Sequence, residues 1–285
     1  MGVFRKDQTV INAFTVDFED WYQGIELPFS SWDQYENRLE FSGGKILDVL
    51  AQFGVKGTFF ILGENARQYP HLIRRIVSEG HNVGTHGDCH EYVYKMTPDD
   101  FRRDLETSMM SIEKACGVKP RSYRAPYFSI TKESYWALDF LKEFGIEYDS
   151  SIVPVKYYRY GIPDAPGNIH SPITALRSED RLTEFPINTI KLAGKKIPVS
   201  GGTYFRLFPY KMIRDAIRTF NSKGQPVIFY IHPWELDPGQ PRIDLPRRVG
   251  LTHYANLKST LPKLNRLLKD FRFSTMEEVI DAVKN

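Results

Sequence analysis

The sequence predicts an α/β protein, a distorted (β/α) barrel of about seven parallel strands that forms a single domain. Two observations indicate this fold. Short apolar runs typical of buried strands alternate with amphipathic helical patterns, and polar clusters follow the ends of several of these runs. Alternating strands and helices build a parallel sheet because each parallel connection needs a crossover, usually a helix. We expect one domain over residues 1–285, with a core at about 12–235 and a C-terminal helix–strand–helix extension at 236–285.

Apolar and β-branched runs predict the strands. Strands of a parallel sheet are buried on both faces, so they have nearly continuous apolar sequences. The expected strands are residues 13–18, 57–62, 81–85, 147–149 and 226–231.

Amphipathic patterns between these runs predict the helices. The clearest one covers residues 98–115, where Phe101, Leu105, Met109 and Ile112 recur at helical spacing with charges between them. At the tail, residues 273–279 indicate a strand that turns into a helix through a Ser/Thr cap with acids in the first turn. The other expected helices are residues 47–53, 73–80, 131–144, 209–222 and 255–271.

Composition excludes some partners. Hydrophobic residues make up 41% and charged residues 26% of the chain, as in ordinary globular proteins. The net charge of +3 comes with no basic run, so we expect no nucleic-acid partner. No segment approaches about 18 consecutive apolar residues, so we expect no membrane span. Residues 1–9 are polar and lack the apolar stretch of a signal peptide, so a cytoplasmic location is expected. These patterns do not indicate an oligomeric state.

His86 and His90 are the most informative pair in the chain. Two imidazoles four residues apart can face one way on a helical turn or converge from a loop, and they form half of a divalent-metal site that also needs a carboxylate. His86 follows an expected strand, and the carboxyl ends of barrel strands carry the active site. Cys89 lies between the histidines, and we expect a buried free thiol there rather than a ligand.

Four other polar clusters follow expected strand ends. The first contains Asp17, Glu19 and Asp20, and such a buried strand ending in acids is unfavourable unless the acids bind something. The others contain Arg124 with Pro126 and Tyr127, then Asp149, and then His232.

Taken together, these clusters resemble the NodB-homology polysaccharide deacetylases, carbohydrate esterase family four. The resemblance covers about residues 12–235, and the five motifs of that family have counterparts here in the same order: residues 15–20, residues 85–90, residues 124–127, Asp149 and residues 230–232. More narrowly, residues 16–21, 160–165 and 232–237 resemble a bacterial branch found with exopolysaccharide and surface-glycan genes.

The resemblance implies a metal-dependent hydrolase that removes acetyl groups from N-acetylated amino sugars of a polysaccharide, an oligosaccharide or a glycan precursor. The implied metal is zinc, with cobalt or nickel as possible substitutes, held by His86, His90 and one acid. Asp17 corresponds to the general base and His232 to the general acid. The backbone N–H of Tyr127 is expected to stabilise the oxyanion. Two pairs are also implied: Arg124 with Asp17, and Asp149 with His232.

The first motif departs from the family pattern, in which the base is followed directly by the metal carboxylate. Phe18 occupies that second position here, and Glu19 and Asp20 follow it. On a regular strand Asp17 and Glu19 share a face, whereas a turn after Phe18 would bring Asp20 round. We favour Asp20 as the ligand, with Glu19 as the alternative. A third alignment makes Glu19 the base and Asp20 the ligand.

Two rival functions remain compatible with these residues. One is a non-sugar amide hydrolase of the allantoinase or cyclic-imide type, and the other is a metal-binding or glycan-binding module without turnover. The complete set of acid, base and ligands favours an enzyme. The irregular segment 153–178 contains Tyr157, Tyr158 and Tyr160, which could stack on sugar rings or pack beneath the loop.

Overall fold

The computed structural model describes residues 10–175, 182–192 and 194–284. The last residues of the irregular segment 153–178, residues 176–178, lie outside the described part. The centre of the structure is one curled parallel sheet of eight strands, close to the number expected. The strands are β1 (Ile11–Phe18), β2 (Thr58–Ile61), β3 (Asn82–Thr85), β4 (Ser122–Tyr123), β5 (Tyr148–Asp149), β6 (Thr183–Glu184), β9 (Ile228–Ile231) and β10 (Arg272–Ser274). The predicted α/β class with a parallel sheet is confirmed.

Strand β1 is the central strand. The sheet order is β10-β1-β2-β3-β4-β5-β6, and β9 also pairs with β1. All these pairings are parallel, and β1 contacts β10 along residues 11–13, β9 along 13–16 and β2 along 15–18. Every residue of β1 after Ile11 is buried, as expected for a central strand of a parallel sheet whose two faces are covered by helices, and this explains its largely apolar composition. Since β10 pairs with β1, the C-terminal segment belongs to the same sheet as the core.

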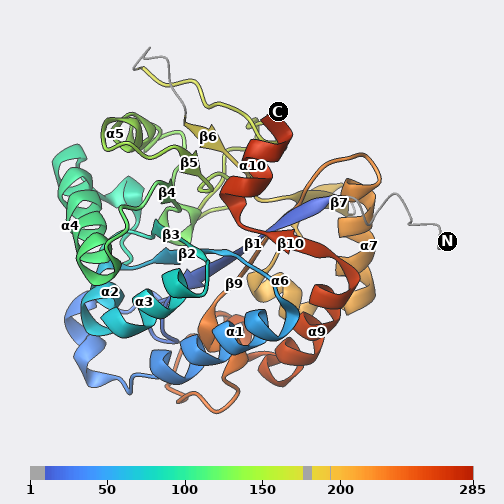
Figure 1. The fold of residues 1–285 in the computed structure, drawn as a ribbon, viewed down its shortest axis with the longest axis horizontal. Helices are drawn as coiled ribbons and strands as arrows, with labels where there is room; N and C mark the ends of the chain where they lie inside the picture. Colours follow the sequence, from blue (N-terminus) through green and yellow to red (C-terminus); the bar gives the residue numbers. More distant parts are fainter. Residues whose placement is uncertain (1–9, 176–181, 193, 285) are drawn as a thin grey trace.

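Helices surround this sheet (Figure 1). They are α1 (Leu39–Phe53), α2 (Gly63–Gln68), α3 (Pro70–Ser78), α4 (Pro98–Cys116), α5 (Ala137–Glu143), α6 (Gly202–Leu207), α7 (Tyr210–Asn221), α8 (Arg247–Tyr254), α9 (Leu257–Asp270) and α10 (Met276–Lys284). Short 3₁₀ helices are η2 (Phe29–Gln34), η3 (Val93–Lys95), η4 (Pro126–Phe128) and η5 (Pro233–Leu236). None of the helices in the described part of the chain combines the length and apolar composition needed to cross a bilayer.

Local signals account for the helices that were predicted well. The expected helix 98–115 is α4, which begins with a capping box between Thr97 and Asp100 and ends at Gly117 in the left-handed conformation. The expected helix 131–144 is shorter: α5 begins only at Ala137, because the Ser134 hydroxyl accepts from the Thr131 N–H and holds this stretch in turns. The hairpin of β7 (Thr189–Leu192) and β8 (Lys195–Pro198) was not predicted.

The two ends of the sheet differ in what covers them. Thr58 begins β2 and Ser122 begins β4, and both hydroxyls donate to Glu277 on α10. Helix α10 therefore packs at the amino ends of β2 and β4. The carboxyl ends remain available for a functional site.

Candidate active site

The sequence-predicted polar residues gather at the carboxyl ends of the strands. Asp17 lies near the end of β1, and Glu19 follows that strand. His86 follows β3, Arg124 follows β4, and His232 follows β9. These strand ends surround a cleft of about 360 Å³ whose lining includes Asp17, Glu19, His86, His90, Tyr127 and His232. The parallel sheet thus brings residues more than two hundred positions apart into one site, as the barrel fold predicts.

Glu19, His86 and His90 form a buried cluster that could hold a metal ion. One ligand atom from each residue lies within 4.8 Å of the other two. His90 Nε2 lies 3.0 Å from Glu19 Oε2. All three side chains are buried, so the cluster is shielded from bulk water.

The two imidazoles are held in the neutral form that a metal requires. Burial lowers the pKa of His86 to about 4 and that of His90 well below its ordinary value of 6.5. His86 Nδ1 lies 2.7 Å from the carbonyl oxygen of Arg124, so it carries the proton and donates to that carbonyl. This contact leaves the lone pair on Nε2, the usual way in which a second partner orients a metal-binding histidine.

The cluster fits a divalent cation. Glu19 Oε2 is buried and accepts no hydrogen bond from the residues that the structure describes. Burial raises the pKa of Glu19 to about 8, so the ionised carboxylate is unfavourable there without a cation beside it. Two neutral imidazoles and one carboxylate are a usual donor set for zinc sites with open positions.

Asp20 lies elsewhere, which corrects the alignment favoured from the sequence. Its Oδ2 accepts from the backbone N–H groups of Arg38 and Leu39 at 2.6 and 2.9 Å, and its Oδ1 accepts from the Trp21 N–H at 2.7 Å. The carboxylate therefore caps the first turn of α1 and is not part of the cluster with His86 and His90. The chain turns at Phe18, where the Glu19 N–H donates to the Asp17 carbonyl at 3.0 Å, and this turn leaves Glu19 beside the histidines and directs Asp20 to the helix.

Asp17 and Arg124 form a buried ion pair beside the cluster. Arg124 Nη1 donates to Asp17 Oδ1 at 2.6 Å and to the Thr15 hydroxyl at 2.9 Å. The remaining guanidinium nitrogens donate to the carbonyl and hydroxyl of Ser150. Burial acts to raise the pKa of Asp17, but the charge and hydrogen bond of Arg124, together with the imidazoles of His86 and His232, outweigh it, so the pKa lies below its ordinary value of 3.8. Asp17 is therefore ionised at neutral pH.

His232 faces both carboxylates of the first motif. Its Nε2 lies 3.1 Å from Glu19 Oε1 and 3.8 Å from Asp17 Oδ2. Burial acts to lower the pKa of His232, but the negative charges of Glu19 and Glu235 raise it to about 9.

The pairing expected between Asp149 and His232 is not the one in the structure. His232 Nδ1 contacts Glu235 Oε1 at 2.8 Å. Asp149 instead accepts a hydrogen bond from the Ser151 hydroxyl, and its other partners include the Glu184 carboxyl group and the charge of Arg124. Glu235 lies three residues after His232, so one 3₁₀ turn brings its carboxylate back to the imidazole, whereas Asp149 lies on a different strand.

Tyr127 borders the cleft in a left-handed backbone conformation, with φ of 55°. Its ring lies against those of His90 and Tyr92, at centroid distances of 4.3 and 4.2 Å. From the irregular segment, Tyr157 and Tyr160 line the cleft, whereas Tyr158 is largely exposed. Cys89 is outside the cluster, and its thiol donates to Asp88.

Sequence reasoning missed two residues of the site, Glu235 and Arg206. Glu235 was visible only as part of the stretch 232–237, to which no role was assigned. Arg206 is buried on α6 and contacts Glu235, but neither its position nor its neighbours carried a local signal. A buried arginine is recognised only when its acidic partner is known.

Comparisons with known protein families divide the chain into two adjoining parts. Residues 33–148 match the family described as polysaccharide deacetylase. Residues 150–281 match a domain of unknown function, DUF3473. The first match contains His86, His90 and Arg124, whereas His232 and Glu235 lie in the second.

Among curated relatives, a peptidoglycan-N-acetylglucosamine deacetylase of Bacillus cereus is 34% identical over 128 residues, which cover 42% of this chain and 46% of that protein. A chitooligosaccharide deacetylase of Bradyrhizobium sp. is 40% identical over 83 residues, or 29% of this chain and 38% of that protein. The chain thus spans less than half the length of these curated relatives.

Two solved structures share the fold. A Mycobacterium smegmatis protein provisionally named a polysaccharide deacetylase has a TM-score of 0.66 at 18% identity, with 99% of this chain and 93% of that chain covered. A family 4 carbohydrate esterase from Streptomyces lividans, in complex with acetate, has a TM-score of 0.50 at 15% identity, with 93% and 91% covered. Over residues 33–148 the chain therefore matches the polysaccharide deacetylase family, and over nearly its whole length it shares the fold of these two solved structures.

Proposed function

We propose that this protein is a metal-dependent hydrolase that removes the acetyl group from an N-acetylated amino sugar of a glycan. The observation that carries the proposal is the convergence of Glu19, His86 and His90 with Asp17 and His232 in one cleft. A cation site, an ionised carboxylate and an imidazole within a few ångströms of one another match what amide hydrolysis needs.

His86, His90 and Glu19 would hold the ion. Zinc is the expected metal because imidazole and carboxylate suit it, and cobalt or nickel could replace it. When bound, the ion would polarise the acetamide carbonyl and lower the pKa of a water molecule toward about 7.

Asp17 is proposed as the general base. Arg124 fixes one of its oxygens and keeps it ionised, and its other oxygen faces His232 across 3.8 Å. An ionised carboxylate fixed on one side can take a proton from the attacking water on the other.

His232 is proposed as the general acid. The amine of an acetamide is a poor leaving group until it is protonated, and Nε2 of His232 points into the cleft. The backbone N–H of Tyr127 is proposed to donate to the oxyanion that forms before the C–N bond breaks.

A carbohydrate is the proposed partner. The two curated relatives are named for deacetylation of peptidoglycan N-acetylglucosamine and of chitooligosaccharide. Tyr157, Tyr160 and Trp234 line the cleft here, and aromatic faces pack well on the apolar faces of sugar rings. The exopolysaccharide branch is a narrower proposal that rests on the motifs of residues 16–21, 160–165 and 232–237.

The test is acetate release from N-acetylated oligosaccharides by the zinc-loaded protein, measured beside allantoin turnover. Acetate release that is lost in the Asp17→Asn variant supports the proposal. Allantoin turnover without acetate release would favour the rival amide hydrolase. Stoichiometric metal without turnover of either substrate would favour a binding module.

A further inference from the structure

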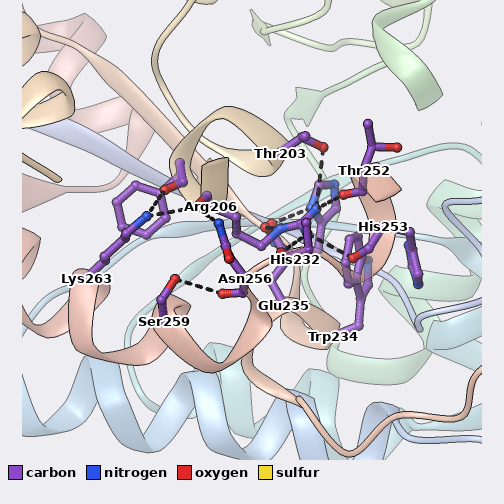
Figure 2. Close-up of polar contacts among 12 residues, drawn as sticks. Thr203, Arg206, His232, Trp234, Glu235, Thr252, His253, Asn256, Ser259 and Lys263 are labelled. Atoms are coloured by element: carbon purple, nitrogen blue, oxygen red, sulfur yellow. Dashed lines mark hydrogen bonds and ion pairs between the residues drawn. The ribbon is translucent and has the colours of Figure 1, made fainter. Parts of the chain in front are cut away.

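We propose that Glu235, held by Arg206, is the positioning residue that orients His232 toward the cleft, in the place where the family resemblance implies Asp149. The inference rests on the proposed function, in which His232 is the general acid. It follows from a buried chain of contacts that runs from His232 through Glu235 to Arg206, as Figure 2 shows.

Glu235 holds His232 at two points. Its Oε1 accepts from the His232 backbone N–H at 3.1 Å and lies 2.8 Å from Nδ1 of the ring. A carboxylate can only accept, so Nδ1 carries a proton and Nε2 is the nitrogen that faces Glu19 and Asp17. The contact therefore selects which ring nitrogen meets the substrate.

Arg206 holds Glu235 in turn. Its Nε donates to Glu235 Oε2 at 2.6 Å, and both side chains are almost completely buried. Burial acts to raise the pKa of Glu235, but Arg206 and His232 hold it at about 2, so Glu235 is ionised. Removing either partner would leave an uncompensated buried charge.

The other nitrogens of Arg206 donate hydrogen bonds to backbone carbonyls beside the cleft. Nη1 donates to the carbonyls of His253 and Ala255 at 2.8 and 2.9 Å, and Nη2 donates to the Thr252 carbonyl at 2.7 Å. These carbonyls lie at the end of α8, and Thr252 and His253 also line the cleft. A planar fork of several donors is needed to reach them all, which lysine cannot supply.

Two packing features fix the geometry further. Trp234 stacks between the rings of His232 and His253, at centroid distances of 5.2 and 4.3 Å (Figure 2). Gly201 precedes α6 and allows it to approach β9, because a Cβ there would lie 1.9 Å from the Tyr230 carbonyl oxygen. The ring of His232 thus has fixed partners at its face and at Nδ1.

The role of Glu235 is orientation, and it takes up no proton. In the proposed step, Nε2 of His232 gives its proton to the amine nitrogen, which receives the electron pair of the breaking C–N bond. The Nδ1 proton stays on the ring and continues to donate to Glu235, so the neutral imidazole remains oriented for the next cycle.

The decisive variant is Glu235→Gln, which keeps the shape but offers one oxygen instead of two. That oxygen can accept from Arg206 or from His232, and the amide NH₂ must then face the other donor. We expect kcat on an N-acetylated oligosaccharide to fall by about a hundredfold or more, while KM changes by less than about threefold. Lys263→Met is the control, because Lys263 supports the end of α6 through the carbonyls of Phe205, Arg206 and Phe208 without contacting His232. It should keep the kcat of the unmodified protein.

A second readout does not depend on turnover. In ¹⁵N-labelled protein loaded with zinc, the NMR signal of His232 Nδ1 should be that of a protonated nitrogen, and this signal should change in Glu235→Gln but not in Lys263→Met. An unprotonated Nδ1 in the unmodified protein, or a kcat for Glu235→Gln within about threefold of normal, would overturn the inference. If the unmodified protein released no acetate, the proposed function would fail, and the Nδ1 signal would still decide the role of Glu235.

Discussion

Adjacent acidic residues have different roles in this protein, as Glu19 and Asp20 show. Glu19 directly follows β1, and its carboxylate lies beside the two histidines. Asp20 lies past the turn and caps α1 through the N–H groups of Arg38 and Leu39. Residue type alone could not separate them, since either carboxylate can bind a metal.

Substituting these neighbours separately tests the assignment. Glu19→Ala should weaken zinc binding by more than the 10- to 100-fold that the loss of an outer partner of a metal site typically causes. Asp20→Ala should keep stoichiometric zinc and lower the free energy of unfolding by about 1–2 kcal/mol, as expected for a lost helix cap. Zinc content after dialysis and urea unfolding measure the two effects. The reverse pattern, with zinc lost only in Asp20→Ala, would restore Asp20 as the ligand.

Asp17→Asn tests the proposed base. The amide cannot accept the proton of water, so kcat should fall by about a hundredfold or more. Zinc should remain bound because Glu19, His86 and His90 are unchanged. Acetate release and metal content are measured on the same preparation. If the variant loses zinc but regains activity after reloading, Asp17 is a ligand and the base must be sought at Glu19.

At the scale of residues, the site residues were predicted better than their hydrogen-bond partners. The motifs identified His86, His90, Asp17 and His232, and the structure brings all four into the cleft. The partner of His232 was missed because Glu235 acts through a turn whose geometry the motif does not encode. Hydrogen-bond partners depend on ångström-scale distances, whereas a sequence pattern gives only residue type and spacing.

At the scale of elements, strands were predicted well because their signal is local. A buried parallel strand is a short apolar run, and β2, β3 and β9 lie within one or two residues of expectation. Helix starts were harder when the cap came from elsewhere in the chain. Helix α1 begins at Leu39, well before the expected residue 47, because Asp20 binds its first N–H groups.

The buried His81, between β2 and β3, predicts that the free energy of unfolding falls in acid. His81 precedes β3, and its Nδ1 accepts the Gly57 N–H at 3.1 Å. Burial lowers the pKa of His81 to about 4, below the ordinary value of 6.5. Between these values the unfolded chain binds more protons than the folded one, so the free energy of unfolding falls as pH falls, by at most about 1.4 kcal/mol per pH unit.

The variant His81→Asn isolates this effect. Its side-chain oxygen can still accept the Gly57 N–H, but it does not titrate. Urea unfolding at pH 7, 6 and 5 should show a shallower decline in stability than in the unmodified protein. Parallel declines would mean that other groups, and not His81, cause the loss in acid.

At the scale of the whole molecule, the two ends of the sheet have separate tasks. Helix α10 closes the amino ends through Glu277, and the candidate site occupies the carboxyl ends. Asp17 and Glu19 precede the part that matches the deacetylase family, and His232 follows it. The site therefore needs the whole sheet. Its residues could each be predicted from the sequence, but their arrangement in one site depends on the strand order, which the sequence patterns did not give.

This convergence predicts that zinc stabilises the entire fold. Residues 19, 86 and 90 come together only when β1 and β3 are in place, so zinc should bind the folded chain far more tightly than the unfolded one. Zinc at about 100 times its Kd should add about 2.7 kcal/mol to the free energy of unfolding. For a chain of this size, each kcal/mol raises Tm by roughly 2–4 °C, so Tm should rise by several degrees over the protein kept in a chelator. The double variant His86→Ala/His90→Ala should melt at the same temperature with and without zinc. An equal zinc-dependent rise in that variant would place the ion elsewhere and remove the main support for the proposed hydrolase.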